Sequence, residues 1–173
     1  MESRSSKLHG CLLKYYRSTE ALSTLYTTVN ETDSRKVSLR LIDWLVTNYS
    51  KSEHVVYYVN GSMVNIYLSY KNMLRAYSKR LFDPFKRHER IFIDCSLSPS
   101  GQFETTVAQL MFFKWAIDNG VIDYAINNRE KIKCHMESST THRKVNKFIK
   151  RKELSNGGRC AHIYNVRMTL SFI

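Results

Sequence analysis

The sequence is poor in cysteine, glycine and proline. Its 173 residues include four Cys, six Gly and two Pro. Cysteine this sparse excludes a small fold held together by disulfides, and we expect free thiols in a reducing, cytosol-like compartment. So few glycines leave little material for phosphate-binding loops, and no G-x-S-x-G or H-E-x-x-H motif is present.

No run of apolar residues is long enough to cross a bilayer. The most apolar stretch, 107–117, has nine apolar residues in eleven, whereas a spanning helix needs roughly 20. The first 30 residues also lack the continuous apolar region of a signal peptide, because Lys14 and Arg17 follow soon after Leu12 and Leu13. The chain is nonetheless 43% hydrophobic and 12% aromatic, which excludes a wholly disordered protein.

The net charge of +12 is distributed unevenly. Residues 1–36 hold six basic and four acidic side chains, and residues 37–128 hold ten and eight. Residues 129–173 hold eleven basic and three acidic side chains. We therefore expect an N-terminal extension (1–36), a nearly neutral core domain (37–128) and a basic C-terminal arm with a terminal strand (129–173).

The basic side chains are the best candidates for contacts with a partner. A cationic segment binds phosphate groups by releasing counterions, and it docks equally well on an acidic protein surface. The candidate partner-binding residues are six in the C-terminal arm and three in the core, namely Arg143, Lys144, Lys147, Lys150, Arg151, Lys152, Lys86, Arg87 and Arg90.

Hydrophobic periodicity predicts several helices and a few short strands. An amphipathic helix should begin after Asp33 or Ser34 and continue through 37–46, with apolar residues on two sides. A strand over 55–59 should end at the turn Asn60–Gly61.

Later segments follow the same rules. Ser62 is expected to cap a helix over 63–82 that ends at Asp83–Pro84. Residues 91–93 are expected to form a strand, and Thr106 is expected to open a capping box for a helix that continues to Asn119–Gly120. The remaining expected elements are a helix over 121–127, a basic helix or arm over 138–152 and a strand over 164–170.

These elements predict a helix-rich α+β fold. We expect a compact helical core with a few short strands and extended N- and C-terminal arms. Trp44 and Trp115 are expected to anchor the core. Tyr70 and Tyr77 lie on the expected core stripe of the 63–82 helix, so packing explains them better than base stacking.

Chemistry-bearing residues show no catalytic pattern. The acidic residues of the core are scattered without paired spacing, and we expect no enzymatic activity. Cys134, His135, Cys160 and His162 could together supply four zinc ligands, but their spacing matches no common zinc finger. We therefore assign no metal and no cofactor, and the zinc hypothesis remains open.

Three segments resemble a small protein family of large nucleocytoplasmic DNA viruses, the group that includes iridoviruses and giant algal viruses. These segments are 38–51, 67–85 and 104–117, and they occur in the family's order within residues 38–126. Members of the family often carry Cys after the Asp-Pro-Phe turn, where this chain has Lys86. None of the three segments is a biochemical signature.

The resemblance implies a viral protein and, as an expectation, a non-enzymatic minor capsid protein. Such a protein would cement neighbouring capsid subunits through its terminal arms on the inner face of the virion, after assembly in the host cytoplasm. Its partners would be the major capsid protein, other minor capsid proteins and an anionic inner-membrane surface. The alternative is a nucleic-acid-binding accessory factor, for transcription or packaging, that uses the basic C-terminal arm.

Overall fold

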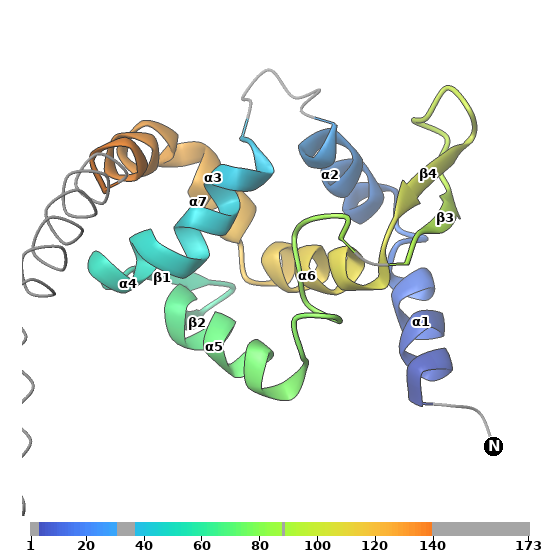
Figure 1. Ribbon diagram of the computed structural model, residues 1–173, viewed down its shortest axis with the longest axis horizontal. Helices are drawn as coiled ribbons and strands as arrows, with labels where there is room; N and C mark the ends of the chain where they lie inside the picture. Colours follow the sequence, from blue (N-terminus) through green and yellow to red (C-terminus); the bar gives the residue numbers. More distant parts are fainter. Residues whose placement is uncertain (1–3, 31–36, 88, 140–173) are drawn as a thin grey trace, which may run out of the picture. The chain divides into compact units, whose positions relative to one another are not determined.

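The computed structural model describes residues 4–30, 37–87 and 89–139, with side chains from Leu8 onward. Contacts divide the chain into two units, Met1–Met136 and Glu137–Ile173. All elements discussed below belong to the first unit, and Figure 1 shows their arrangement. The described residues of this unit form a helix-rich α+β fold with two small antiparallel sheets, as expected from the sequence.

Helix α6 lies at the centre of the unit (Figure 1). It comprises Val107–Asp118, and both N-terminal helices, α1 (Arg4–Tyr15) and α2 (Thr19–Val29), contact it. The sequence suggested that residues 1–36 extend away from the core, and in this respect the expectation was wrong.

Buried side chains explain why α1 and α2 belong to the core. Leu12, Tyr16 and Leu25 are almost completely buried. The hydroxyl of Tyr16 donates a hydrogen bond of 2.8 Å to the backbone oxygen of Leu110 on α6. An apolar stripe on each of these two helices packs against α6. The net charge of residues 1–36 is low and does not oppose that contact.

The next helical segment changes its geometry along its length. Ser38 caps α3 (Leu39–Trp44) by accepting a hydrogen bond from the backbone N–H of Leu41. A π-helical turn (Leu45–Tyr49) and the short α4 (Ser50–Ser52) follow without a break.

This segment is apolar on two sides, as expected. Leu41 and Leu45 are buried on one side, and Ile42 and Val46 are buried on the other. The helix was expected to begin after Asp33 or Ser34 and to include residues 37–38, which was wrong, because Ser38 provides the cap and the helix begins at Leu39. The expected cap residues 33–34 themselves lie outside the described part of the chain.

Strands β1 (Val56–Val59) and β2 (Ser62–Asn65) form an antiparallel hairpin. The turn between them consists of Asn60 and Gly61, with φ of 49° and 78°. Two successive residues with positive φ form the type I′ turn that matches the twist of a hairpin.

The prediction of a helix over 63–82 was wrong at both ends. Residues 62–65 pair with β1 because the type I′ turn returns the chain along that strand. Asn65 then caps α5 (Ile66–Ala76) by accepting a hydrogen bond of 2.9 Å from the N–H of Leu68. The helix ends well before Pro84, because Tyr77 adopts an extended conformation.

The second hairpin leads into the central helix. Strand β3 (Ile91–Asp94), expected from the sequence, pairs with β4 (Gln102–Thr105), which was not. Thr106 accepts a hydrogen bond of 3.1 Å from the N–H of Gln109, which confirms the expected cap of α6. Helix α7 (Val121–Asn127) follows α6, also as expected.

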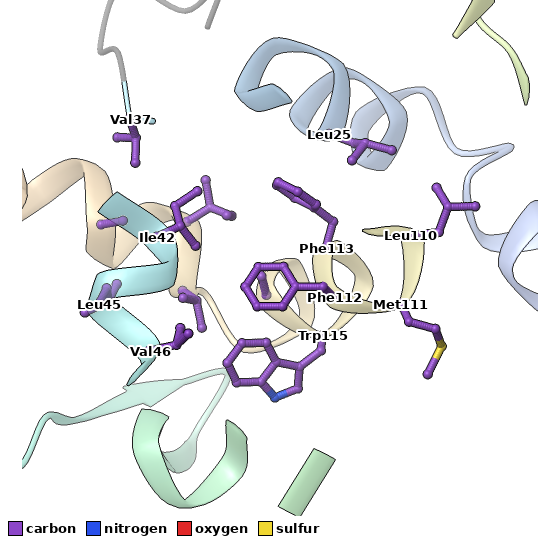
Figure 2. Close-up of a cluster of buried hydrophobic side chains, with 14 of the residues drawn as sticks. Leu25, Val37, Ile42, Leu45, Val46, Leu110, Met111, Phe112, Phe113 and Trp115 are labelled. Atoms are coloured by element: carbon purple, nitrogen blue, oxygen red, sulfur yellow. The ribbon is translucent and has the colours of Figure 1, made fainter. Parts of the chain in front are cut away.

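The hydrophobic core gathers around α6 (Figure 2). Phe112 and Phe113 are fully buried, and Trp115 retains 5% exposure. Trp115 therefore anchors the core as expected, whereas Trp44 is only partly buried. The close-up labels side chains from α2, α3, the π-helical turn and α6, together with Val37, which precedes α3, namely Leu25, Val37, Ile42, Leu45, Val46, Leu110, Met111, Phe112, Phe113 and Trp115.

Several expectations fall outside the described residues. Residues 129–136 are helical. The basic segment expected over 138–152 is described only up to residue 139, and the strand expected over 164–170 is not described. No helix among the described residues is long and apolar enough to span a membrane.

Candidate functional site

A buried polar network holds the turn at Asp83 against the start of α6. The side-chain amide of Gln109, which is fully buried, donates a hydrogen bond of 2.8 Å to the backbone oxygen of Pro84. The amide oxygen of Gln109 accepts a hydrogen bond of 2.9 Å from the hydroxyl of Thr105. The carboxylate of Asp83 accepts from the N–H of Phe85 at 3.1 Å. These hydrogen bonds hold the backbone at Pro84 and Phe85, immediately before the basic residues Lys86 and Arg87.

The structure describes three of the nine predicted partner-binding residues. The ammonium group of Lys86 lies 5.1 Å from the ring centre of Phe103. Nε of Arg87 lies 3.6 Å from a carboxylate oxygen of Asp83, and Nε of Arg90 lies 3.5 Å from one of Glu104. The six residues predicted in the C-terminal arm lie outside the described part of the chain, namely Arg143, Lys144, Lys147, Lys150, Arg151 and Lys152.

These contacts reduce the charge that the 86–90 segment offers to an anionic partner. Arg87 and Arg90 each lie beside a carboxylate of the same chain, and Lys86 lies over an aromatic ring. Exposed ion pairs contribute little stability, but each pair lowers the local positive potential. The segment is therefore a weaker phosphate site than its composition suggested.

Asp43 and Asp83 lie close enough for one carboxyl group to influence the pKa of the other, and we call them the acidic pair, which the sequence did not reveal. Burial raises the pKa of Asp43 above its ordinary value of 3.8, and the nearby carboxylate of Asp83 raises it further. Arg87 and Lys79 act in the opposite direction. Burial and the same two carboxylates raise the pKa of Tyr70 to about 12.

Three cavities lie in the described part of the chain, beside Leu13, Leu8 and Ile126, and none of them is lined by Asp43, Asp83 or Tyr70. We therefore assign no binding role to the pair. Asp43 and Asp83 are 40 positions apart in the sequence, so no pattern of local spacing could have predicted that they lie close together.

His135 is a structural link in the described part of the chain. Its Nδ1 accepts a hydrogen bond of 3.0 Å from the indole N–H of Trp44, so Nε2 is the protonated nitrogen and donates to the hydroxyl oxygen of Ser52 at 3.0 Å. The imidazole also packs edge to face against Tyr49, with 5.3 Å between ring centres. Both ring nitrogens are thus engaged in contacts that join residues 129–136 to α3 and α4.

The zinc hypothesis gains no support from these contacts. Cys134 is exposed, and Cys160 and His162 lie outside the described residues. Within residues 4–30, 37–87 and 89–139, no three His, Cys, Asp or Glu side chains are grouped as a metal site would require. The described cysteines Cys11, Cys95 and Cys134 are free thiols, in agreement with the sequence.

The largest of the three cavities lies between the junction of α1 and α2 and the β3–β4 hairpin. Its volume is about 670 Å³. Leu13, Phe92 and Leu97 line it and expose 36%, 63% and 44% of their surfaces. Arg17 and Asp94 add one charge of each sign. We call this the hairpin groove, and its mixed lining resembles a protein-binding surface more than a phosphate site.

The sequence contained a partial signal for this groove. Residues 102–105 are Gln-Phe-Glu-Thr, so polar and apolar residues alternate over the first three positions after Gly101, and exposed and buried positions alternate along the strand that they form. Glycine at a φ of 72° is suited to the loop that returns the chain from β3. The exposure of Phe92 and Leu97, by contrast, depends on the placement of α1 and α2.

Comparison with known proteins identifies the family. A model of a family of unknown function (DUF7197) matches residues 13–167, so the chain belongs to that family. A protein of Acanthamoeba polyphaga mimivirus, "Uncharacterized protein L507", is 37% identical over 128 residues. The aligned segment covers 69% of this chain and 49% of the mimivirus protein, which is about half of that relative's length. No solved structure matches the chain.

These comparisons confirm the resemblance to a protein family of large DNA viruses. They carry no information about a capsid role, which remains a prediction. The family match also includes α1 from Leu13 and all of α2, the two helices that the resemblance of the three central segments left out.

Proposed function

We propose that this chain is a non-enzymatic structural protein of a large DNA virus particle, a minor capsid protein that holds neighbouring capsid subunits together. The observation that carries the proposal is the hairpin groove, where Leu13, Phe92 and Leu97 are large, apolar and exposed. Exposed apolar side chains beside mixed charges are typical of a surface that another protein covers.

The hairpin that bears the groove is rigidly supported. Ile93 and Phe103 are buried on its inner face, and the ring of Phe103 packs edge to face against Tyr26 of α2 at 5.5 Å. Phe92 therefore projects from a fixed strand and needs little ordering when it binds. A preorganised contact loses less conformational entropy on association.

Photo-cross-linking in assembled particles tests the proposal. A photoreactive amino acid at Leu97 should cross-link to the major capsid protein, and the same amino acid at Asp123, exposed on α7, should do so far less. The cross-link from Leu97 should disappear when the particles are dissolved. Absence of the chain from purified particles, or equal cross-linking from both positions, would contradict the proposal.

A nucleic-acid-binding accessory factor remains the second candidate. Residues 129–173 hold eleven basic and three acidic side chains, which supports binding to phosphate groups. Binding to duplex DNA that weakens steeply as salt increases, together with absence from particles, would favour this alternative.

A further inference from the structure

One continuous stretch of the described chain carries no negative side chain. Between Glu53 and Asp83 the sequence has no acidic residue. This stretch forms β1, β2, α5 and the turn that follows, and it contains four exposed cationic side chains, namely Lys71, Arg75, Lys79 and Arg80. None of the four forms an ion pair with a carboxylate in the part of the chain that the structure describes, although Lys79 lies close enough to Asp43 to lower the pKa of its carboxyl group.

The same stretch exposes large apolar side chains. Val56, Tyr58 and Met63 on the first hairpin expose 46%, 75% and 68% of their surfaces, and Leu68 on α5 exposes 58%. Tyr58 and Met63 are directly paired across the hairpin, so they lie on one face of it. Side chains alternate between faces along a strand, so Val56 lies on that face too.

The opposite face of the hairpin is anchored at the end of α6. The hydroxyl of Tyr57 donates a hydrogen bond of 2.8 Å to the backbone oxygen of Asn119. Its ring stacks on that of Tyr124, with 5.1 Å between centres and 12° between planes. Tyr58 and its neighbours therefore point away from the core and cannot turn inward without breaking these contacts.

Helix α5 presents its cations on the side that faces away from α6. Its inner side is fixed by Tyr70, which packs against Trp115, and by the hydroxyl of Ser69, which accepts a hydrogen bond of 2.9 Å from the indole N–H of Trp115. Leu68, Lys71 and Arg75 are exposed at helical spacing, which places them on the outer side.

We infer that this apolar and cationic face, formed by Val56, Tyr58, Met63, Leu68, Lys71 and Arg75, binds the surface of an anionic lipid bilayer. The apolar side chains would enter the boundary between headgroups and acyl chains, and the cations would lie against the headgroups. Such a surface rests on the bilayer without spanning it.

Charge and side-chain type favour lipid over other partners. Three of the four exposed apolar residues are aliphatic, and Tyr58 is the one aromatic, whereas single-stranded nucleic acid is bound by stacking bases on several aromatic rings. The absence of acidic residues from position 54 to position 82 matches the uniform negative charge of an anionic membrane. The hairpin groove, by comparison, combines charges of both signs.

Sedimentation with lipid vesicles tests the inference with the full chain. The protein should bind vesicles that contain phosphatidylserine and phosphatidylcholine, and bind phosphatidylcholine vesicles much less. The apolar variant Tyr58→Ser/Met63→Ser should lower the partition coefficient at least about tenfold. The charge variant Lys71→Glu/Arg75→Glu should also lower it at least about tenfold.

Matched variants on other surfaces provide the controls. Phe92→Ser/Leu97→Ser removes two exposed apolar side chains from the hairpin groove, and Lys131→Glu/Lys133→Glu reverses two exposed charges beyond α7. Both should keep at least half of the wild-type binding. The variant Leu68→Ser tests the same face from α5, in case Tyr58→Ser/Met63→Ser disturbs the hairpin.

Any of three results would overturn the inference. In the first case, the wild-type protein does not sediment with anionic vesicles, and in the second, the test and control variants lose vesicle binding equally. In the third case, the test variants bind duplex DNA more weakly than the wild type does but bind vesicles equally well. The inference does not depend on the proposed capsid role. Failure of vesicle binding would leave the cross-link from Leu97 unaffected, and absence from particles would leave vesicle binding unaffected.

Discussion

At the scale of single residues, the described side chains satisfy their polar groups internally. No buried side-chain nitrogen or oxygen in the described part of the chain lacks a hydrogen-bond partner. Gln109 illustrates the point, since its amide bonds to both Thr105 and Pro84 while its backbone N–H bonds to Thr106. The sequence identified Gln109 as part of a helix cap, but its side chain serves the neighbouring turn instead of the cap.

Replacement of Gln109 by leucine should destabilise the protein by about 2–4 kcal/mol. The substitution leaves the carbonyl of Pro84 and the hydroxyl of Thr105 buried without partners, and each such group costs about 1–3 kcal/mol. Urea unfolding measures the change. Gln102→Leu, at an exposed position on β4, should change stability by less than about 0.5 kcal/mol. A similar small change for Gln109→Leu would contradict the interpretation.

At the scale of secondary-structure elements, local signals predicted the starts of elements better than their partners. Thr106 as a cap and the turn at Asn60 and Gly61 are short-range features, and the structure confirms both. Pairing of 62–65 with β1 follows from the same turn, but the sequence interpretation assigned residues 63–65 to the next helix and so missed the second strand of the hairpin.

The packing of α1 and α2 depends on contacts between segments that are distant in the sequence. Their apolar residues are visible in the sequence, but burial of these residues requires the surface of α6, which is about 90 positions away. Exposure of Phe92 and the approach of Asp43 to Asp83 likewise depend on contacts between distant segments. The candidate interaction surfaces were therefore the part of the molecule that sequence patterns predicted least.

Gly120 should be sensitive to substitution because it joins α6 to α7 beneath the first hairpin. Its φ is 63°, and a Cβ atom there would lie 3.1 Å from Cγ2 of Val59. We expect Gly120→Ala to destabilise the protein by about 1–2 kcal/mol, since alanine is strained at this φ.

Gly10 is the matched control. It lies within α1, and a Cβ atom there would meet nothing within 4 Å. Gly10→Ala should stabilise the protein by about 0.5–1 kcal/mol, because alanine favours the helix. Thermal unfolding of both variants should therefore show shifts of opposite sign, and equal shifts would refute the argument.

At the scale of the whole molecule, net charge is a poor guide to local surfaces. The core from 37 to 128 is nearly neutral, yet it contains a strongly basic stretch between Lys71 and Arg90 that acidic residues elsewhere offset. The first hairpin and α5 belong to a stretch without acidic residues, from position 54 to position 82, whereas the groove at the second hairpin combines charges of both signs.

The stability of the whole fold should depend on the protonation of Asp43. Burial raises the pKa of Asp43, so the folded protein holds this proton more tightly than the unfolded chain does. Linkage then requires stability to fall as the pH rises from below 3.8 through the raised folded-state pKa. Asp43→Asn should accordingly stabilise the protein more at pH 7 than at pH 3.

Urea unfolding at the two pH values provides the measurement for Asp43→Asn. Equal effects of Asp43→Asn at both pH values would show that burial does not control this carboxyl group.

The central helix sets the geometry between two potential points of attachment. The first hairpin is hydrogen-bonded to Asn119 at the C-terminal end of α6. Strand β4 continues directly into Thr106 at the N-terminal end of α6. Twelve helical residues make α6 a rigid spacer of about 18 Å. Two weak contacts held at a fixed distance reinforce each other through their effective concentration. One inserted residue would turn one hairpin by about 100° relative to the other, so the length of this helix determines whether both surfaces can be occupied at once.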